Sequence, residues 1–271
     1  MALELVLKSF LEQKIICWNT ESEISTVNDI IVEEPLSIRV QGSPYAIVMR
    51  TPGDEIEHAA GFCLAEGVID TLDDFISIAF CDEDDTNVVA VTLNQKRRKL
   101  ISQILERRGF ISQTSCGLCG KEIVEDLYQE IRPISEDIVI NRTKALSCLE
   151  DLSKHQPLRA RTKASHAAAF YSSDLEFLSA AEDVGRHNAL DKAVGKLFLK
   201  EMLGNASVLT LSSRISYELV QKAAQARIPV ILAISRPTSL AVQLAFQLNI
   251  TLACLAPGNG LYIFNHANRL V

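Results

Sequence analysis

Residues 207–255 carry the pattern that decides the fold: SVLTLSSRISYELVQKAAQARIPVILAISRPTSLAVQLAFQLNITLACL. Three apolar runs alternate here with two amphipathic segments, in the order 207–211, 213–226, 229–234, 238–248 and 251–255. Continuous apolar runs are typical of parallel strands that are covered on both faces, and the segments between them predict the covering helices. The last third of the chain is therefore expected to form an α/β sheet.

Both strand-to-helix loops in this region pair a serine with an arginine, at Ser213-Arg214 and Ser235-Arg236. In parallel α/β sheets, ligands bind on the loops that follow the carboxyl ends of the strands. Arginines beside hydroxyl groups suit phosphate, although the glycines and lysine of a P-loop or dinucleotide fingerprint are absent. Residues 256–260 add a third loop, which we expect at the same edge.

Another polar cluster occupies residues 182–192, EDVGRHNALDK. A predicted strand ends there, and the first turn of the next helix carries Arg186 and His187, which favours an anion site at the helix N-terminus. Asp183 and Asp191 lie four residues to either side of His187, so a carboxylate could orient the imidazole. The alternative is a capped helix with ordinary polar surface groups.

The first hundred residues have a different organisation. Four predicted strands and one helix follow the order β-β-α-β-β, at 33–40, 45–49, 51–67, 75–80 and 88–93. Residues 1–30 give no strong signal. We predict a small α+β domain over 1–110 and an α/β domain over 111–271. In that second domain we expect a helix at 141–154, and over 163–170 a turn that enters a buried strand, which pairs with 175–181.

Near the junction of these units, at the start of the second, lies Ser115-Cys116-Gly117-Leu118-Cys119-Gly120. A nearby helix N-terminus and Lys121 would both favour the thiolate, which is the nucleophilic form of cysteine. The motif alone leaves two interpretations open: a reactive sulfur site, or half of a structural zinc site that needs two further ligands. A disulfide is disfavoured in a cytosolic protein.

The other cysteines lie in apolar runs or strands and are expected to be buried and poorly reactive: Cys17, Cys63, Cys81, Cys148 and Cys254. His58 is expected on the surface of its helix.

The composition of the chain limits the classes of function that are expected. The chain has 271 residues and a formal net charge of −7, which disfavours a general nucleic-acid binder. The N-terminus lacks a basic segment with a cleavage site, and no apolar run approaches membrane-spanning length. We expect a cytoplasmic protein without a nucleic-acid or membrane partner.

Several segments together resemble the FdhD family, the formate dehydrogenase accessory sulfurtransferases. The matching pieces are Cys116 to Gly120, His166 to Ala169, Glu182 to Lys192, Arg214 to Glu218, and Pro237 to Ala241. Three places depart from the family pattern: Lys163-Ala164-Ser165, Ser212-Ser213-Arg214, and Pro257-Gly258-Asn259-Gly260.

The resemblance implies a sulfur carrier. A cysteine desulfurase would load sulfur on Cys116 as a persulfide, with Cys119 as its partner or as a second carrier. The sulfur would pass to the molybdenum cofactor, bis(molybdopterin guanine dinucleotide), before that cofactor enters formate dehydrogenase. The family's cofactor-binding stretch maps to Leu255, Ala256, Pro257, Gly258, Asn259 and Gly260.

We further expect the cofactor or GDP, as its mimic, to be bound by Arg214, Arg236, Ser213, Ser235, His166, Asp183, Arg186 and His187, with no metal ligated by the protein. The resemblance also implies a fold similar to cytidine deaminase for the larger domain, and we expect a homodimer.

Two other functions are alternatives to the sulfur carrier. A zinc-dependent deaminase needs an H-x-E motif, but Ala167 and Ala168 follow His166, so the catalytic glutamate is absent. The second is a non-catalytic chaperone that binds the guanine nucleotide or the molybdenum cofactor and uses the CxxC motif for structural zinc.

Overall fold

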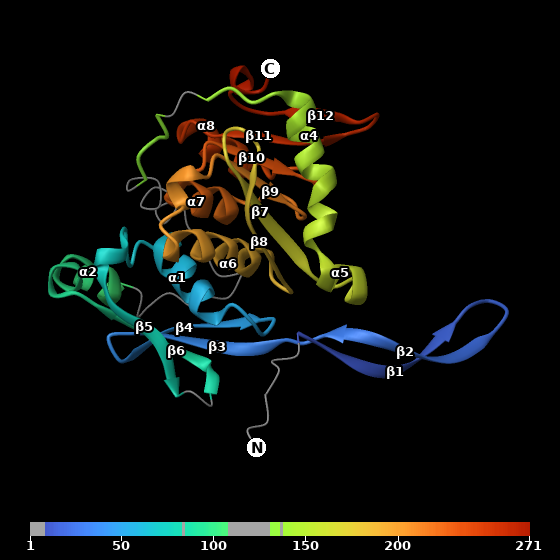
Figure 1. The fold of residues 1–271 in the computed structure, drawn as a ribbon, viewed down its shortest axis with the longest axis horizontal. Helices are drawn as coiled ribbons and strands as arrows, with labels where there is room; N and C mark the ends of the chain where they lie inside the picture. Colours follow the sequence, from blue (N-terminus) through green and yellow to red (C-terminus); the bar gives the residue numbers. More distant parts are fainter. Residues whose placement is uncertain (1–8, 83–84, 108–130, 136–137) are drawn as a thin grey trace.

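The computed structural model describes residues 9–82, 85–107, 131–135 and 138–271, which form a mixed α/β fold with three sheets (Figure 1). This confirms the predicted fold class. The proposed domain boundary near residue 110 lies outside the described residues. The described part contains no helix that combines the length and the hydrophobicity a membrane span requires.

The largest sheet has six strands in the order β12-β11-β10-β9-β7-β8. Its members are β7 (His166–Tyr171), β8 (Phe177–Asp183), β9 (Val208–Leu211), β10 (Val230–Ala233), β11 (Thr251–Ala256) and β12 (Gly260–Ile263). The central β9, β10 and β11 are parallel, as the apolar runs predicted, whereas β7, β8 and β12 extend the sheet in antiparallel pairings.

Helices cover both faces of this sheet. On one face lie α6 (Arg186–Leu199), α7 (Tyr217–Gln225) and α8 (Ser239–Gln247), and on the other lies α4 (Arg142–Asp151) (Figure 1). Neighbouring residues of a strand therefore belong to different hydrophobic cores. Ile231 lies in the core that contains residues of α6, α7 and α8, and Leu232 lies in the core that contains residues of α4. The result is a three-layer unit, because successive side chains of a strand point to opposite faces.

A second sheet of four strands has the order β4-β3-β6-β5. Its strands are β3 (Glu34–Val40), β4 (Ser43–Arg50), β5 (Phe75–Asp82) and β6 (Asp85–Leu93). Between the strand pairs lies α1 (Glu55–Ala65), so the predicted β-β-α-β-β order is confirmed. This sheet shares one continuous hydrophobic core with α6, α7 and α8.

The two sheets meet where α1 packs on α6. A Cβ atom added to Gly61 would lie 1.9 Å from the carbonyl oxygen of Asp191, and one added to Gly195 would lie 1.8 Å from that of Glu57. The backbones of α1 and α6 therefore touch at two glycines, where no larger side chain fits.

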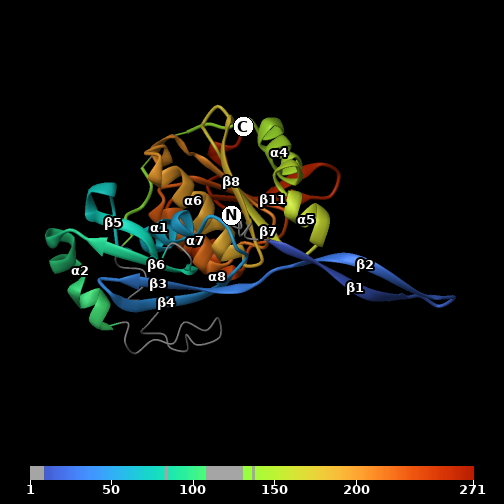
Figure 2. The same cartoon turned by 60° about the horizontal axis from the view of Figure 1, so that its bottom comes forward.

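The remaining elements of the described residues are α2 (Gln95–Arg107), α5 (Pro157–Thr162) and the 3-10 turns Leu72–Asp74, Leu152–His155, Leu203–Asn205 and Ala267–Arg269. The N-terminal region, where no clear pattern predicted an element, forms a two-stranded hairpin of β1 (Phe10–Trp18) and β2 (Glu23–Ile31) that projects from the body (Figures 1 and 2).

Candidate functional site

Strand register gathers the predicted binding segments at one edge of the six-stranded sheet. His166 pairs with Asp183 across β7 and β8. Leu211 pairs with Ala233, which in turn pairs with Cys254. The start of β7 and the ends of β8 to β11 therefore lie at the same edge, and the loops that follow these ends share it.

The two Ser-Arg loops run side by side. Ile215 and Pro237 form a parallel bridge, and the Thr238 amide donates to the Ile215 carbonyl at 3.0 Å. Arg214 and Arg236 each precede a bridged residue, so they occupy equivalent positions in neighbouring loops. Both arginines are exposed.

The serines of these loops differ. Ser213 is buried, and its hydroxyl donates to the Arg214 carbonyl at 2.9 Å, so it shapes the loop. Ser235 is exposed. The neighbouring Ser212 accepts from the Ala167 amide at 2.8 Å and ties this loop to β7.

Positive charge collects next to these loops at the start of α6. Arg186 has a lowered pKa, first because of burial and then because Arg214 lies nearby. The pKa of His166 is lowered by burial and by the charges of Arg186 and Arg159. Arg186 Nε and His166 Nδ1 are buried and meet no hydrogen-bond partner within the described part of the chain. Such a cluster suits an anionic ligand, which would relieve the mutual repulsion and provide acceptors.

The partner of His187 is Glu218, four residues beyond Arg214. The His187 Nε2 atom lies 2.8 Å from Glu218 Oε2 and 3.3 Å from the hydroxyl of Ser216. The hydrogen bond with His187 lowers the pKa of the Glu218 carboxyl, although partial burial opposes the shift. The sequence prediction that Asp183 or Asp191 orients this imidazole is therefore wrong.

Asp183 has a structural position. It is fully buried, forms an ion pair of 2.7 Å with Lys192, and accepts from the amides of Thr51 and Gly185 and from Asn188. The helical spacing did not apply because Asp183 belongs to β8 and α6 begins only at Arg186. Since its oxygens are already used, its predicted contact with a cofactor finds no support in this geometry.

Thr51, which precedes α1, makes further hydrogen bonds to the residues around Asp183. Its carbonyl accepts from Lys192 Nζ at 2.7 Å, and its hydroxyl accepts from the Val184 amide at 3.1 Å. The polar cluster thus joins the entry of α1 to the end of β8. Sequence reasoning missed Thr51 and Lys192, because their pairing spans more than 130 residues.

A second buried pair lies deeper between α6 and α7. Lys222 Nζ contacts both carboxylate oxygens of Asp191 at 2.8 and 2.9 Å. Asp191 is therefore paired, although burial raises its pKa. His58 is fully buried beside these charges, and its pKa is lowered well below 6.5 by burial, then by Lys192 and Lys222. The predicted surface position of His58 is wrong because that face of α1 packs on α6.

The C-terminal loop is a tight connection between β11 and β12. Leu255, Ala256 and Gly260 belong to the two strands, while Pro257, Gly258 and Asn259 form an exposed turn. Both Gly258 and Asn259 have positive φ angles, 73° and 54°. Arg236 stacks over the Tyr262 ring, with Cζ 5.0 Å from the ring centroid, so β12 adds an aromatic surface that the sequence prediction did not include.

Cys116 and Cys119 lie outside the described residues. Of the other cysteines, Cys63, Cys148 and Cys254 are buried as predicted. Cys17 and Cys81 are exposed, which contradicts the prediction. Apolar neighbours misled it, because Cys17 lies in the projecting hairpin and Cys81 in an uncovered part of β5.

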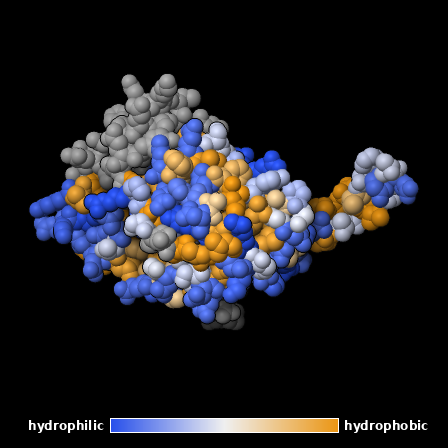
Figure 3. Space-filling view, turned by 90° about the horizontal axis from the view of Figure 1, so that it is seen from above, coloured by the Kyte–Doolittle hydropathy of each residue, from blue (hydrophilic) through white to orange (hydrophobic). Residues whose placement is uncertain are grey.

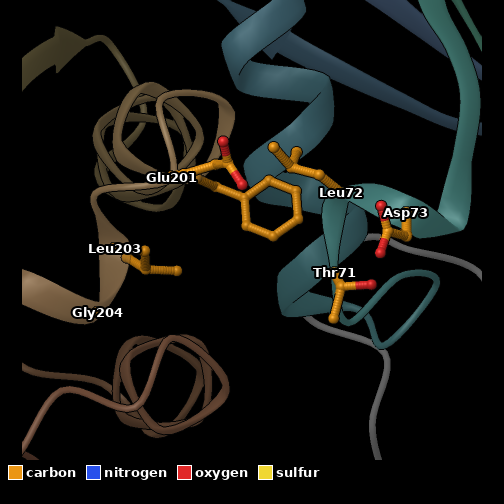
Figure 4. Close-up of a pocket in the computed structure, with 7 residues that line it drawn as sticks. Thr71, Leu72, Asp73, Glu201, Leu203 and Gly204 are labelled. Carbon is orange, nitrogen blue, oxygen red and sulfur yellow. The ribbon is translucent and has the colours of Figure 1, made fainter.

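One cavity of about 230 Å³ lies elsewhere, beside the C-terminal end of α6 (Figure 4). Thr71, Leu72 and Asp73 face Glu201, Leu203 and Gly204 across it, with Phe198 completing the lining. Because α6 has 14 residues, its two ends lie ~20 Å apart. The cavity is thus separate from the sheet edge beside which Arg186, Arg214 and Arg236 lie, called the arginine edge below. In the described ranges, no group of three or more His, Cys, Asp or Glu side chains could hold a metal ion.

Comparisons with known proteins agree on one family. The FdhD/NarQ family pattern matches residues 31–271. A Mycobacterium tuberculosis protein named sulfur carrier protein FdhD is 36% identical over 264 residues, which cover 93% of this chain and 95% of that protein. A Streptomyces coelicolor protein of the same name is 41% identical over 261 residues, with 92% of each chain covered.

A solved structure has the same fold. It is described as that of a formate dehydrogenase accessory protein from Desulfotalea psychrophila. The TM-score is 0.78 at 22% sequence identity, and the match covers 97% of this chain and all of the other.

Proposed function

The chain belongs to the FdhD/NarQ family, and we propose that it is a sulfurtransferase that carries sulfur to the molybdenum cofactor of formate dehydrogenase. A cysteine desulfurase supplies the sulfur, which travels as a persulfide on Cys116 with Cys119 as its partner. The acceptor is the bis(molybdopterin guanine dinucleotide) form of the cofactor, bound as substrate. The relatives' name and the CxxC motif support the sulfur half of this proposal.

The observation that carries the cofactor half is the row of arginines at one sheet edge. Arg214 and Arg236 occupy equivalent positions in neighbouring loops, and Arg186 lies close enough to Arg214 to have its pKa lowered by it. A chain with a net charge of −7 concentrates positive charge here. The two phosphates of a guanine dinucleotide provide the negative charge that this edge lacks.

Different side chains of the described residues would have different roles in binding the cofactor. The exposed guanidinium groups of Arg214 and Arg236 would hold the phosphates, with the hydroxyl of Ser235 beside them. Arg186 and His166 would donate from the buried side, where each has a nitrogen that meets no hydrogen-bond partner among the described residues. Glu218 fixes His187 next to this site. Asp183 supports the site indirectly, because its carboxylate accepts a hydrogen bond from the Gly185 amide and thereby fixes the start of α6.

Titration calorimetry with GDP tests the cofactor half. Because a charge-assisted hydrogen bond contributes about 1.5–3 kcal/mol, Arg214→Ala and Arg236→Ala should each weaken GDP binding roughly tenfold or more. Arg98→Ala removes an exposed arginine of α2 and serves as the control, with affinity within about twofold of wild type. Unchanged affinity in both loop variants would show that the nucleotide binds elsewhere.

Intact-mass measurement after incubation with a cysteine desulfurase and cysteine tests the sulfur half. Wild type and Arg214→Ala should gain sulfur, whereas Cys116→Ala should not and should fail to activate formate dehydrogenase. Full activation by Cys116→Ala would refute its assignment. If the protein instead carries zinc and gains no sulfur, it is a chaperone with a structural CxxC site.

A further inference from the structure

Tyr262 lies level with the arginine edge, on the outer strand β12. The strand register places it in one row with Leu211 of β9, Ala233 of β10 and Cys254 of β11. Both Ser-Arg loops begin directly after this row, because β9 ends at Leu211 and β10 ends at Ala233. The Tyr262 side chain is therefore close to the point where the two loops leave the sheet.

The row projects to the face of the sheet that α6, α7 and α8 cover. Leu211, Ala233 and Cys254 belong to the hydrophobic core under these helices and are almost fully buried. Directly opposite residues of an antiparallel pair share a face, so Tyr262 projects to the same side as Cys254. Because β12 is the outermost strand, the tyrosine is 41% exposed and a ligand can reach its ring.

The side chain of Arg236 lies against this ring. Its Cζ atom is 5.0 Å from the ring centroid of Tyr262. Burial raises the pKa of the Cys254 thiol, and the charge of Arg236 opposes that shift, which is consistent with a guanidinium near the same row. A contact between an exposed cation and an aromatic ring is weaker than a hydrogen bond between guanidinium and phosphate. A phosphate group at the arginine edge would therefore draw Arg236 away from the ring.

The ring is part of a larger apolar surface. Phe264 comes two residues after Tyr262, and its amide donates to the Leu252 carbonyl at 2.9 Å, which continues the pairing with β11. Side chains alternate along a strand, so both aromatic rings project to the same side. Figure 3 views the molecule from the side on which Figure 1 places α8 and β12, and hydrophobic residues reach the surface there. The arginine edge thus adjoins a surface that suits a flat aromatic group.

A nucleoside diphosphate combines the two groups that this arrangement suits. Its phosphates complement Arg214 and Arg236, and its base is a flat aromatic ring. Bases stack on tyrosine rings in many nucleic-acid-binding proteins, and the contact tolerates any base because every base has a π-face. Arginines by themselves bind phosphate in any compound, so a ring contact beside them would distinguish a nucleotide from free diphosphate.

We propose that Tyr262 is the base-stacking residue of the cofactor site. When Arg236 turns to the phosphates, the guanine base takes its place on the Tyr262 ring. This inference rests on the proposed function, because it concerns the guanine nucleotide part of the same cofactor. Tyr262 binds the base and makes no contact with phosphate, so the tyrosine and Arg236 recognise different parts of the ligand.

Titration calorimetry with two ligands separates these roles. The ligands are GDP and inorganic pyrophosphate, which has the phosphates but no base. Tyr262→Leu removes the ring and keeps an apolar side chain, so it should weaken GDP binding at least about fivefold and leave pyrophosphate binding within about twofold of wild type. Tyr262→Phe keeps the ring and should bind GDP within about twofold of wild type. Arg236→Ala should weaken the binding of both ligands.

Phe246→Leu is the matched control. Phe246 is 66% exposed and lies near the C-terminal end of α8, away from the loop that precedes this helix. Its replacement removes an exposed aromatic ring from the same side of the molecule and should leave the affinity for both ligands unchanged. A second measurement follows the base itself. In NMR spectra, the H8 proton of GDP should shift upfield on binding to wild type, because it enters the ring current of Tyr262, and the shift should be lost with Tyr262→Leu.

The possible failures of this inference and of the proposed function are distinguishable. If Tyr262→Leu weakens GDP and pyrophosphate binding equally, the tyrosine acts only by holding Arg236, and the inference is wrong. It is also wrong if Arg236→Ala weakens GDP binding and Tyr262→Leu does not, although the proposed function then stands. A wild-type protein that binds no GDP would contradict the cofactor half of the proposed function, and this inference with it.

Discussion

His187 Nε2 lies 2.8 Å from the carboxylate of Glu218, and this contact joins the first turns of α6 and α7 beside the arginine edge. Both residues are partly exposed, so the pair orients side chains more than it stabilises the fold. A residue at the N-terminus of α7 thus determines the geometry of the polar cluster at α6.

Removing the imidazole should raise the pKa of Glu218. The His187 hydrogen bond is the largest influence holding that pKa below its usual range, and burial acts in the opposite direction. In His187→Ala, the carboxyl should therefore protonate at higher pH, which NMR titration of the side-chain carboxyl carbon would show. His155→Ala, whose ring stacks on Phe177, is the control and should leave the titration unchanged. A lower pKa in His187→Ala would contradict this account.

Asp183→Asn should destabilise the fold by about 3–5 kcal/mol, because it leaves the buried charge of Lys192 without its partner. Chemical denaturation would measure this loss. Calorimetry on the folded variant should find GDP affinity close to wild type if Asp183 only supports the site. A variant of unchanged stability with strongly weakened GDP binding would instead restore Asp183 as a ligand-binding residue.

Gly195→Ala should cost about 3 kcal/mol of unfolding free energy, because the new methyl group would overlap the Glu57 carbonyl of α1 and force the helices apart. Gly204→Ala provides the matched control. A Cβ there meets no atom within 4 Å, and we expect a change within about 0.5 kcal/mol. Equal thermal melting temperatures for the two variants would show that the crossing of α1 and α6 is not as tight as described.

Thiol labelling at neutral pH should separate the cysteines by exposure. Cys17 and Cys81 should react quickly. Cys63 should resist, because burial raises its pKa to about 12, and Cys148 should resist with a pKa of about 11. Peptide mass spectrometry would measure the rates, with labelling in denaturant as the control for complete reaction. Modification of native Cys63 as fast as Cys17 would contradict the burial of α1.

His58 should make the protein less stable in acid. Its folded pKa is well below 6.5, so below pH 6.5 the unfolded chain binds a proton that the folded chain does not. Stability from this residue is therefore complete above pH 6.5 and falls with decreasing pH, by about 1.4 kcal/mol at pH 5.5. Denaturation of wild type and His58→Gln between pH 7.5 and 5.5 would measure the difference. Parallel pH profiles would show that His58 does not titrate in this way.

Much of the fold was determined by the sequence. Apolar runs and helical periodicity predicted β9, α7, β10, α8 and β11, and the β-β-α-β-β order of the first unit, because both patterns are local and repeat every two or 3.6 residues. The convergence of Arg214 and Arg236 also followed from sequence, since parallel strands place their carboxyl ends at one edge.

Other features required the tertiary structure, because they depend on partners far apart in the chain. The partnership of Asp183 with Thr51 and Lys192 could not be deduced from its spacing to His187, and Glu218 became the imidazole's partner only when α7 packed beside α6. The β1–β2 hairpin escaped prediction because no other described element covers either of its faces, so its apolar residues do not alternate with polar ones as in a half-buried strand. The periodicity of a short segment predicts which face of one helix or strand is buried. The partner of a buried charge, and whether a strand is covered, depend on residues that are distant in the sequence and come close only in the folded chain.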